Sequence, residues 1–98
     1  MKRVPPSKMF SKPPSDAHDP EGAKAPGKPS SEEGFKDPQG GEQWVPNPNG
    51  AGSGWLDDKG KVWCPTGKGG RAHGGPHWDV QNPDDGTHTN VYPGGRRR

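Results

Sequence analysis

Glycine and proline limit what this chain can fold into more than any other feature of the sequence. Among 98 residues there are 17 glycines and 14 prolines, and hydrophobic residues make up only 21%. Proline plus glycine above about 25–30% of a chain, without a period, is typical of disorder, and a chain of this length holds one domain at most. We therefore expect only part of the chain to fold, with little helix.

The composition divides the chain in two. Residues 1–33 contain few sizeable apolar side chains, too few to offset an ordering cost of about 1–2 kcal/mol per residue. We expect this segment to be a disordered linker or tail, in which His18 is solvated and has no organised neighbours. The folded domain is expected over residues 34–98, where large aromatic side chains would anchor a small core. Four tryptophans are predicted to be core residues first and base-stacking residues second: Trp44, Trp55, Trp63 and Trp78.

Short β-prone runs separated by turn-forming residues predict a mainly β fold. We expect a small twisted antiparallel sheet of short hairpins with long glycine- and proline-rich loops, little helix, and the disordered tail in front of it. The clearest hairpin surrounds the glycine-terminated turn at residues 57–60. The predicted strands cover residues 43–45, 54–56, 61–64, 77–81 and 87–92.

Polar and apolar side chains alternate in the fourth of these strands. His77, Asp79 and Gln81 would face one side, and Trp78 and Val80 the other. A helix is disfavoured because the sequence GGP precedes the strand. The pattern predicts a polar, reactive row backed by an apolar anchor, and we take it as the candidate site.

The pairing of the last strand follows from burial. If Val91 joins Trp78 and Val80 on the buried face, then Thr87 and Thr89 fall on that face as well. The opposite face would then carry His88, Asn90 and Tyr92 next to His77, Asp79 and Gln81. A slip by one residue would bury His88 and expose Val91, so the first register is preferred.

Charge, cysteine content and hydropathy exclude several classes of protein. The net charge of +2 is too small to indicate a nucleic-acid partner by itself. Cys64 is the single cysteine, so an internal disulfide and a zinc site built from several thiolates are excluded, and we assign the thiol to packing. No apolar run approaches the roughly 20 residues of a membrane span or the 7–15-residue core of a standard signal peptide. If the protein is exported, we expect a route other than a standard signal peptide. We also expect it to be a monomer.

A basic, glycine-rich loop leads into the candidate site. Its GKGG string (residues 67–70) lacks the Ser or Thr and the following helix of a phosphate-binding P-loop. Backbone N–H groups freed by glycine, together with Lys68 and Arg71, could still surround a phosphate.

Five stretches of the chain resemble the polymorphic toxin type 37 domain. They are WVPNPNG (44–50), GWLDDKGKVW (54–63), PTG (65–67), AHGGPHWDVQ (72–81) and VYPGG (91–95). The resemblance runs from about residue 34 to the end, and the fourth string is its most specific part. It implies a ribonuclease module of bacterial competition, delivered into a target-cell cytoplasm by a secretion system or a larger parent chain, and a cognate immunity protein. The cationic loop predicts that this immunity protein is acidic.

The residue types favour metal-independent RNA cleavage, in which the 2′-hydroxyl attacks the adjacent phosphate. Histidine and carboxylate side chains suit the two proton transfers, each of which contributes about 10²–10⁴-fold. We expect His77 to act as general base or acid and Asp79 to orient it or share the proton. The remaining roles are assigned as follows: His73 or His88 as complementary acid or base, Lys68 or Arg71 on the phosphate, and Gln81, Asn90 and Tyr92 in substrate binding. No cofactor or metal is required, and DNA would be spared.

Two other readings stay open. His73, His77, Asp79 and His88 could hold a divalent metal of a metal-dependent nuclease, although the GGP sequence prevents the helix that would bring His73 and His77 together. Alternatively, exposed tryptophans could stack on bases or sugars in a non-catalytic binding module, with the polar row as a solvated sheet face. Sensitivity of the activity to a chelator separates the metal-independent from the metal-dependent nuclease. Loss of toxicity on substitution of His77 or Asp79 by alanine separates a reactive row from a solvated face.

Overall fold

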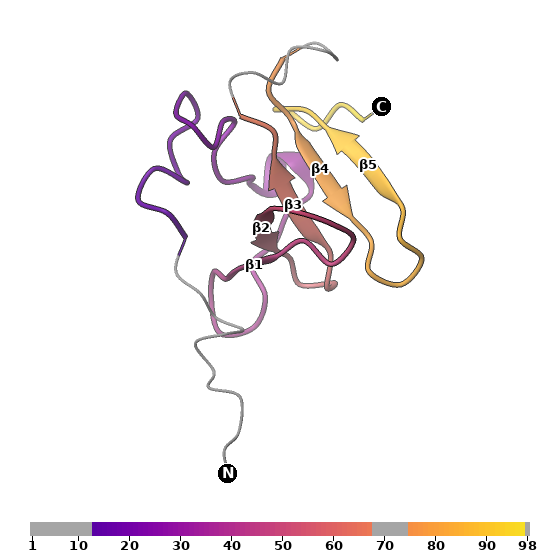
Figure 1. Cartoon of the computed structure of the whole chain (residues 1–98). Helices are drawn as coiled ribbons and strands as arrows, with labels where there is room; N and C mark the ends of the chain where they lie inside the picture. The colour runs from indigo at the N-terminus through magenta and orange to yellow at the C-terminus, as the bar shows by residue number, and fades with distance from the viewer. Residues whose placement is uncertain (1–12, 68–74, 98) are drawn as a thin grey trace.

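The protein forms one antiparallel sheet whose strands follow each other in chain order. The computed structural model describes residues 13–67 and 75–97. In that part of the chain five strands are arranged in the order β1-β2-β3-β4-β5 (Figure 1). The strands are Trp44–Pro46 (β1), Ser53–Leu56 (β2), Val62–Pro65 (β3), Trp78–Gln81 (β4) and His88–Val91 (β5). The prediction of a mainly β fold built from short hairpins is confirmed.

The predicted pairing of the last two strands is also confirmed. Trp78 lies opposite Val91 and Val80 lies opposite Thr89, on one face of the sheet. Asp79 lies opposite Asn90, on the other face. Alternation determined this register, because a shift of one residue would have moved Val91 into solvent.

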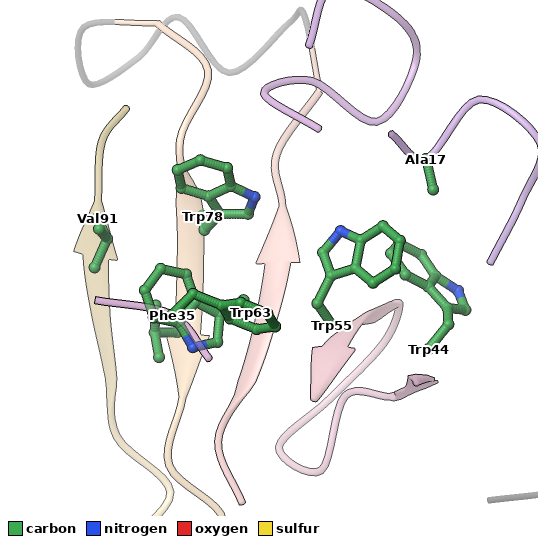
Figure 2. Close-up of a cluster of buried hydrophobic side chains, with 8 residues drawn as sticks. Ala17, Phe35, Trp44, Trp55, Trp63, Trp78 and Val91 are labelled. Carbon is green, nitrogen blue, oxygen red and sulfur yellow. The ribbon is translucent and has the colours of Figure 1, made fainter. Parts of the chain in front are cut away.

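All four tryptophans lie on the same face and build the core (Figure 2). Trp44 and Trp55 meet edge to face with ring centroids 5.0 Å apart, and Trp63 and Trp78 do so at 5.9 Å. Phe35 closes the cluster against Trp63, at 5.4 Å. Such edge-to-face pairs stabilise by about 0.5–1.5 kcal/mol beyond the area they bury. A few large rings thus supply the core that a chain with so few apolar residues needs.

The β2–β3 hairpin is held by one carboxylate and one glycine. Asp57 accepts hydrogen bonds from the backbone amides of Lys59 (2.8 Å) and Lys61 (2.9 Å) and from the indole Nε1 of Trp63 (2.9 Å). Gly54 has no side chain because a Cβ there would collide with the carbonyl oxygen of Trp63 on the neighbouring strand. The turn is therefore tied directly to the core.

The segment in front of the sheet differs from our expectation of a disordered tail up to residue 33. Residues 13–33 contain a succession of turns that lie against the core face, and Ala17 and Ala25 are fully buried (Figures 1 and 2). The indole Nε1 of Trp78 donates a 2.8 Å hydrogen bond to the carbonyl oxygen of Gly27. Small residues and prolines can cover a surface of large rings without large apolar side chains of their own. The first 12 residues of the expected tail lie outside the described part.

His18 has organised neighbours, contrary to the sequence-based expectation. Its ring lies 5.0 Å from that of Trp55, and its Nε2 lies 3.1 Å from both carboxylate oxygens of Glu42. Lys28 bonds the same carboxylate at 2.9 Å and that of Asp37 at 2.9 Å. This ion-pair cluster fastens the N-terminal segment to the edge of the core.

A second fastening joins the N-terminal segment to the C-terminal end. The 3-10 turn Ser31–Glu33 (η2) begins with a capping box, in which Glu33 accepts from the backbone amide of Ser30 at 2.7 Å. The other carboxylate oxygen of Glu33 accepts from the amide of Gly94, also at 2.7 Å. Glu33 is buried, so its hydrogen bonds stabilise a closed fold rather than a solvated surface.

Candidate functional site

The face of β4 and β5 that points away from the tryptophans carries the predicted polar row. The pairing places Asp79 opposite Asn90, and Gln81 opposite His88. His77 immediately precedes β4, and its ring stacks on that of Tyr92, which follows β5, with centroids 4.8 Å apart and planes inclined by 29°. Six of the predicted site residues are thus brought together on this site face.

His77 has acceptors at both ring nitrogens. Its Nδ1 lies 2.9 Å from the carbonyl oxygen of Gly75, and its Nε2 lies 3.2 Å from Oδ1 of Asp79. A carbonyl oxygen can only accept, so Nδ1 carries a proton. A neutral imidazole would then present a lone pair to the Asp79 carboxylate, and the contact is favourable only if a further proton lies between the two groups. The geometry of the pair is therefore suited to a proton shared between the two side chains.

Exposure differs sharply within this pair. The side chain of His77 is 5% exposed, whereas that of Asp79 is 34% exposed. The backbone amide of His77 is also bound, by the hydroxyl oxygen of Thr66 at 3.1 Å. A substrate in solution would therefore meet Asp79 first, with His77 fixed behind it.

Two arms of the chain border the row. The guanidinium of Arg96 lies 4.8 Å above the ring of Tyr92, which brings a permanent positive charge to the site face. On the other side, Asn49 donates to the carboxamide oxygen of Gln81 at 3.0 Å and to the carbonyl oxygen of Asn82 at 3.2 Å. Gln81 thus holds the 47–52 loop against the sheet.

Asn90 and His88 differ in how accessible their side chains are to solvent. The carboxamide oxygen of Asn90 is buried and has no hydrogen-bond partner among residues 13–67 and 75–97, which is uncommon in a folded protein. His88 is exposed. Because it is a diagonal neighbour of Asp79 on the same face, its Cα lies about 7–8 Å from that of Asp79 in standard sheet geometry. That separation can admit a phosphodiester between the two side chains.

Cys64 lies beside the row, opposite Asp79 on β3. Burial, and then the negative charge of Asp79, raise the pKa of its thiol to about 12. A neutral thiol is a poor nucleophile and a poor metal ligand. Cys64 is therefore a packing residue at neutral pH.

Three predicted site residues, Lys68, Arg71 and His73, lie outside the described residues. Within residues 13–67 and 75–97 no three histidine, cysteine or acidic side chains are grouped as a metal site. The tryptophans are at most 7% exposed, so the alternative of a binding module with exposed tryptophans is wrong. They are buried because their face of the sheet is covered by the N-terminal segment.

Sequence reasoning missed three residues that shape the site: Asn49, Thr66 and Arg96. Asn49 and Thr66 act from loops that become neighbours of β4 only after folding. For Arg96, the basic sequence at residues 96–98 was a signal, but its position over Tyr92 depends on the chain turning back after β5. The backbone amide of Tyr92 donates to the carbonyl oxygen of Arg96 at 2.8 Å, which makes that turn.

Comparison with known proteins identifies a family. A family model described as bacterial toxin 37 matches residues 23–95. No curated protein and no solved structure matches the chain. The match begins before residue 34, in the segment that covers the core. In the described part of the chain, no helix has the length and apolar character needed to cross a membrane.

Proposed function

Because this chain belongs to the bacterial toxin 37 family, we propose that its toxic activity is the metal-independent cleavage of RNA at the site face of β4 and β5. The observation that carries this proposal is the contact of 3.2 Å between Nε2 of the buried His77 and Oδ1 of the more accessible Asp79. In this proposal the pair holds a proton behind the half-exposed carboxylate of Asp79. RNA cleavage by the 2′-hydroxyl needs a proton donor of this kind, because the 5′-oxygen that leaves the phosphorus must be protonated.

The pair of His77 and Asp79 acts as the general acid. The 2′-oxygen of a ribose forms a bond to phosphorus while the bond from phosphorus to the 5′-oxygen of the next nucleotide breaks. The proton shared by the pair passes through Asp79 to that leaving oxygen. Products are a 2′,3′-cyclic phosphate and a 5′-hydroxyl. DNA has no 2′-hydroxyl and is not cleaved by this route.

His88 acts as the general base in this arrangement. Three features support this role: His88 is exposed, it lies on the same face, and its diagonal position relative to Asp79 leaves room for a phosphate between the two groups. It takes the proton from the 2′-hydroxyl. A positioned acid and a positioned base each contribute about 10²–10⁴-fold to such reactions.

Positive charge is needed where negative charge gathers on the phosphate. Arg96, stacked over Tyr92, supports this role, and Lys68 and Arg71 remain candidates from the sequence. Asn90 lies opposite Asp79 on the site face, which supports a role in substrate binding. Gln81 contributes through the Asn49 loop that it holds in place.

Membership of a toxin family also supports an immunity protein as the partner and delivery by a secretion system as the route. We propose that the immunity protein is acidic and covers the site face, so that its carboxylates meet Arg96 and the basic loop. Complementary charge of this kind accelerates association and makes it depend on salt. We further propose that the toxin domain itself is a monomer.

The test is induced expression of the full chain in bacteria, with sequencing of RNA ends. We expect growth arrest and discrete new ends that carry 5′-hydroxyl and cyclic phosphate groups. The purified chain should give the same ends in the presence of a chelator. Ends with 5′-phosphates, or a loss of cleavage on chelation, would contradict the metal-independent mechanism.

A further inference from the structure

A pocket lies on the opposite side of the sheet from His77. It has a volume of about 260 Å³ and lies between the β2–β3 turn and the C-terminal end of the chain. Trp63, Val80 and Val91 form its apolar floor, and all three belong to the core face of β3, β4 and β5. The residues of the site face contribute nothing to its lining.

Cations dominate the rim of this pocket. Lys59, Lys61 and Arg97 line it together with a single carboxylate, that of Asp57. Asp57 is buried and accepts three hydrogen bonds within the β2–β3 hairpin, so it is already engaged. Neither Lys59 nor Lys61 forms an ion pair at contact distance in the described part of the chain.

Arg97 is held in place without losing its charge. Its Nη1 donates to the carbonyl oxygen of Gly95 at 3.0 Å and its Nη2 donates to the carbonyl oxygen of Glu33 at 3.1 Å. Neutral acceptors orient the guanidinium but do not neutralise it. A guanidinium has five N–H donors, so donors remain for a ligand. A fixed arginine of this kind is suited to bidentate binding of phosphate.

We propose that this pocket binds one nucleotide of a single-stranded RNA, with its phosphate on Lys61 and Arg97 and its base at the pocket floor beside Val80. The three cations match a phosphate, and the small apolar area left by the nearly buried floor residues can be covered by the edge of a base. The pocket volume of about 260 Å³ suits a single nucleotide better than a larger group. The site is distinct from the proposed catalytic row, but the choice of RNA rests on the proposed function.

Arg96 and Arg97 connect the pocket to the catalytic face. Arg97 pairs with Val91 on the core side, and its neighbour Arg96 lies over Tyr92 on the site face. Consecutive residues of an extended segment point to opposite faces. The two arginines thus form a cationic ridge over the β5 edge, along which a chain with regularly spaced phosphates can pass from the pocket to Asp79. An acidic protein has no comparable repeat, which is why we favour RNA.

The first test measures binding of the full chain to a short 2′-O-methyl RNA, which lacks a reactive hydroxyl, by fluorescence anisotropy. Lys61→Gln is compared with Lys24→Gln, which removes the same charge away from the pocket. We expect Lys61→Gln to weaken binding about tenfold at low salt and to reduce the slope of log affinity against log salt by about 0.7, the value for one phosphate contact on a single strand. Lys24→Gln should change affinity less than about twofold. Equal effects of the two variants would overturn the proposal.

The second test locates the ligand. Titration with a nucleoside monophosphate should shift the indole N–H resonance of Trp63 and the amide resonances of Lys59 and Lys61, at concentrations about tenfold lower than inorganic phosphate requires. Equal affinity for both probes would overturn the placement of the base. If Lys61→Gln binds RNA like the parent but loses binding to an acidic immunity protein, the pocket is a protein contact and the proposal is wrong.

The two proposals can fail separately. A chain that binds RNA through Lys61 but cleaves none would support the pocket and overturn the nuclease. A chain that cleaves RNA, with Lys61→Gln binding the inert RNA like the parent, would overturn the pocket alone.

Discussion

The indole Nε1 of Trp78 donates a hydrogen bond of 2.8 Å to the carbonyl oxygen of Gly27, 51 residues earlier in the chain. Trp78 immediately precedes Asp79, so this bond ties the covering segment to the strand that carries the site. We predict that a chain starting at residue 34 is less stable than the full chain by about 3 kcal/mol or more, because it loses this bond and uncovers large rings. Urea denaturation followed by tryptophan fluorescence measures the difference. Equal stability would mean that residues 13–33 are only a tail.

Two substitutions of Trp78 separate its packing from its hydrogen bond. Trp78→Ala should cost about 3–5 kcal/mol, enough to unfold a domain of this size. Trp78→Phe keeps most of the ring and leaves the Gly27 carbonyl without its donor, at a cost of about 1–3 kcal/mol. Thermal denaturation of both variants measures whether Trp78→Ala is the less stable of the two. A Trp78→Phe variant as unstable as Trp78→Ala would show that the bond, rather than the ring, dominates.

The carboxyl group of Glu33 makes the free energy of unfolding depend on pH in the acid range. Burial raises the pKa of its carboxyl, but hydrogen bonds from Gly94 and Ser30 outweigh burial, and the pKa lies below its ordinary value. The resulting stabilisation is fully present above the unfolded pKa of about 4.3 and is lost as pH falls through the folded value. We predict that Glu33→Gln is less stable than the parent at neutral pH and that the gap narrows below about pH 4. Urea midpoints across this range provide the measurement, and a gap independent of pH would contradict the account.

Cys64 should react slowly with alkylating reagents in the folded protein. Its pKa of about 12 leaves far less thiolate at pH 8 than a free cysteine has, by a factor on the order of a thousand. Alkylation by iodoacetamide, followed by mass spectrometry with and without urea, gives the ratio of rates. Similar rates in both conditions would show that the thiol is not shielded by burial and Asp79.

The sequence was sufficient to predict the sheet and the two faces of its last hairpin. Alternation in residues 77–81 and 87–92 specifies which side chains share a face, and burial of Val91 specifies the register. The covering role of residues 13–33 could not be predicted, because it depends on turns and on contacts such as Trp78 with Gly27 that leave no periodic pattern. The cationic pocket was also missed, since Lys61 and Arg97 meet only when the C-terminal end returns along β5.

The difference in exposure between His77 and Asp79 could not be predicted from the sequence either. Alternation places His77 and Asp79 on one face, but it does not reveal that stacking on Tyr92 buries the histidine and leaves the carboxylate accessible. This arrangement changes the proposed division of roles. In the proposed mechanism the pair holds the proton and Asp79 delivers it to the leaving oxygen.

The most direct test of the nuclease proposal is the single-turnover rate of RNA cleavage by Asp79→Asn, compared with Asp84→Asn. Asp84 is an exposed carboxylate in the β4–β5 turn, so its variant removes the same charge away from the proposed acid. We predict that Asp79→Asn lowers the rate by at least about 100-fold while keeping the thermal midpoint of the parent, because it removes a general acid. Asp84→Asn should stay within about twofold. A folded Asp79→Asn variant that cleaves RNA at the parent rate would contradict the assignment of the His77 and Asp79 pair as the acid.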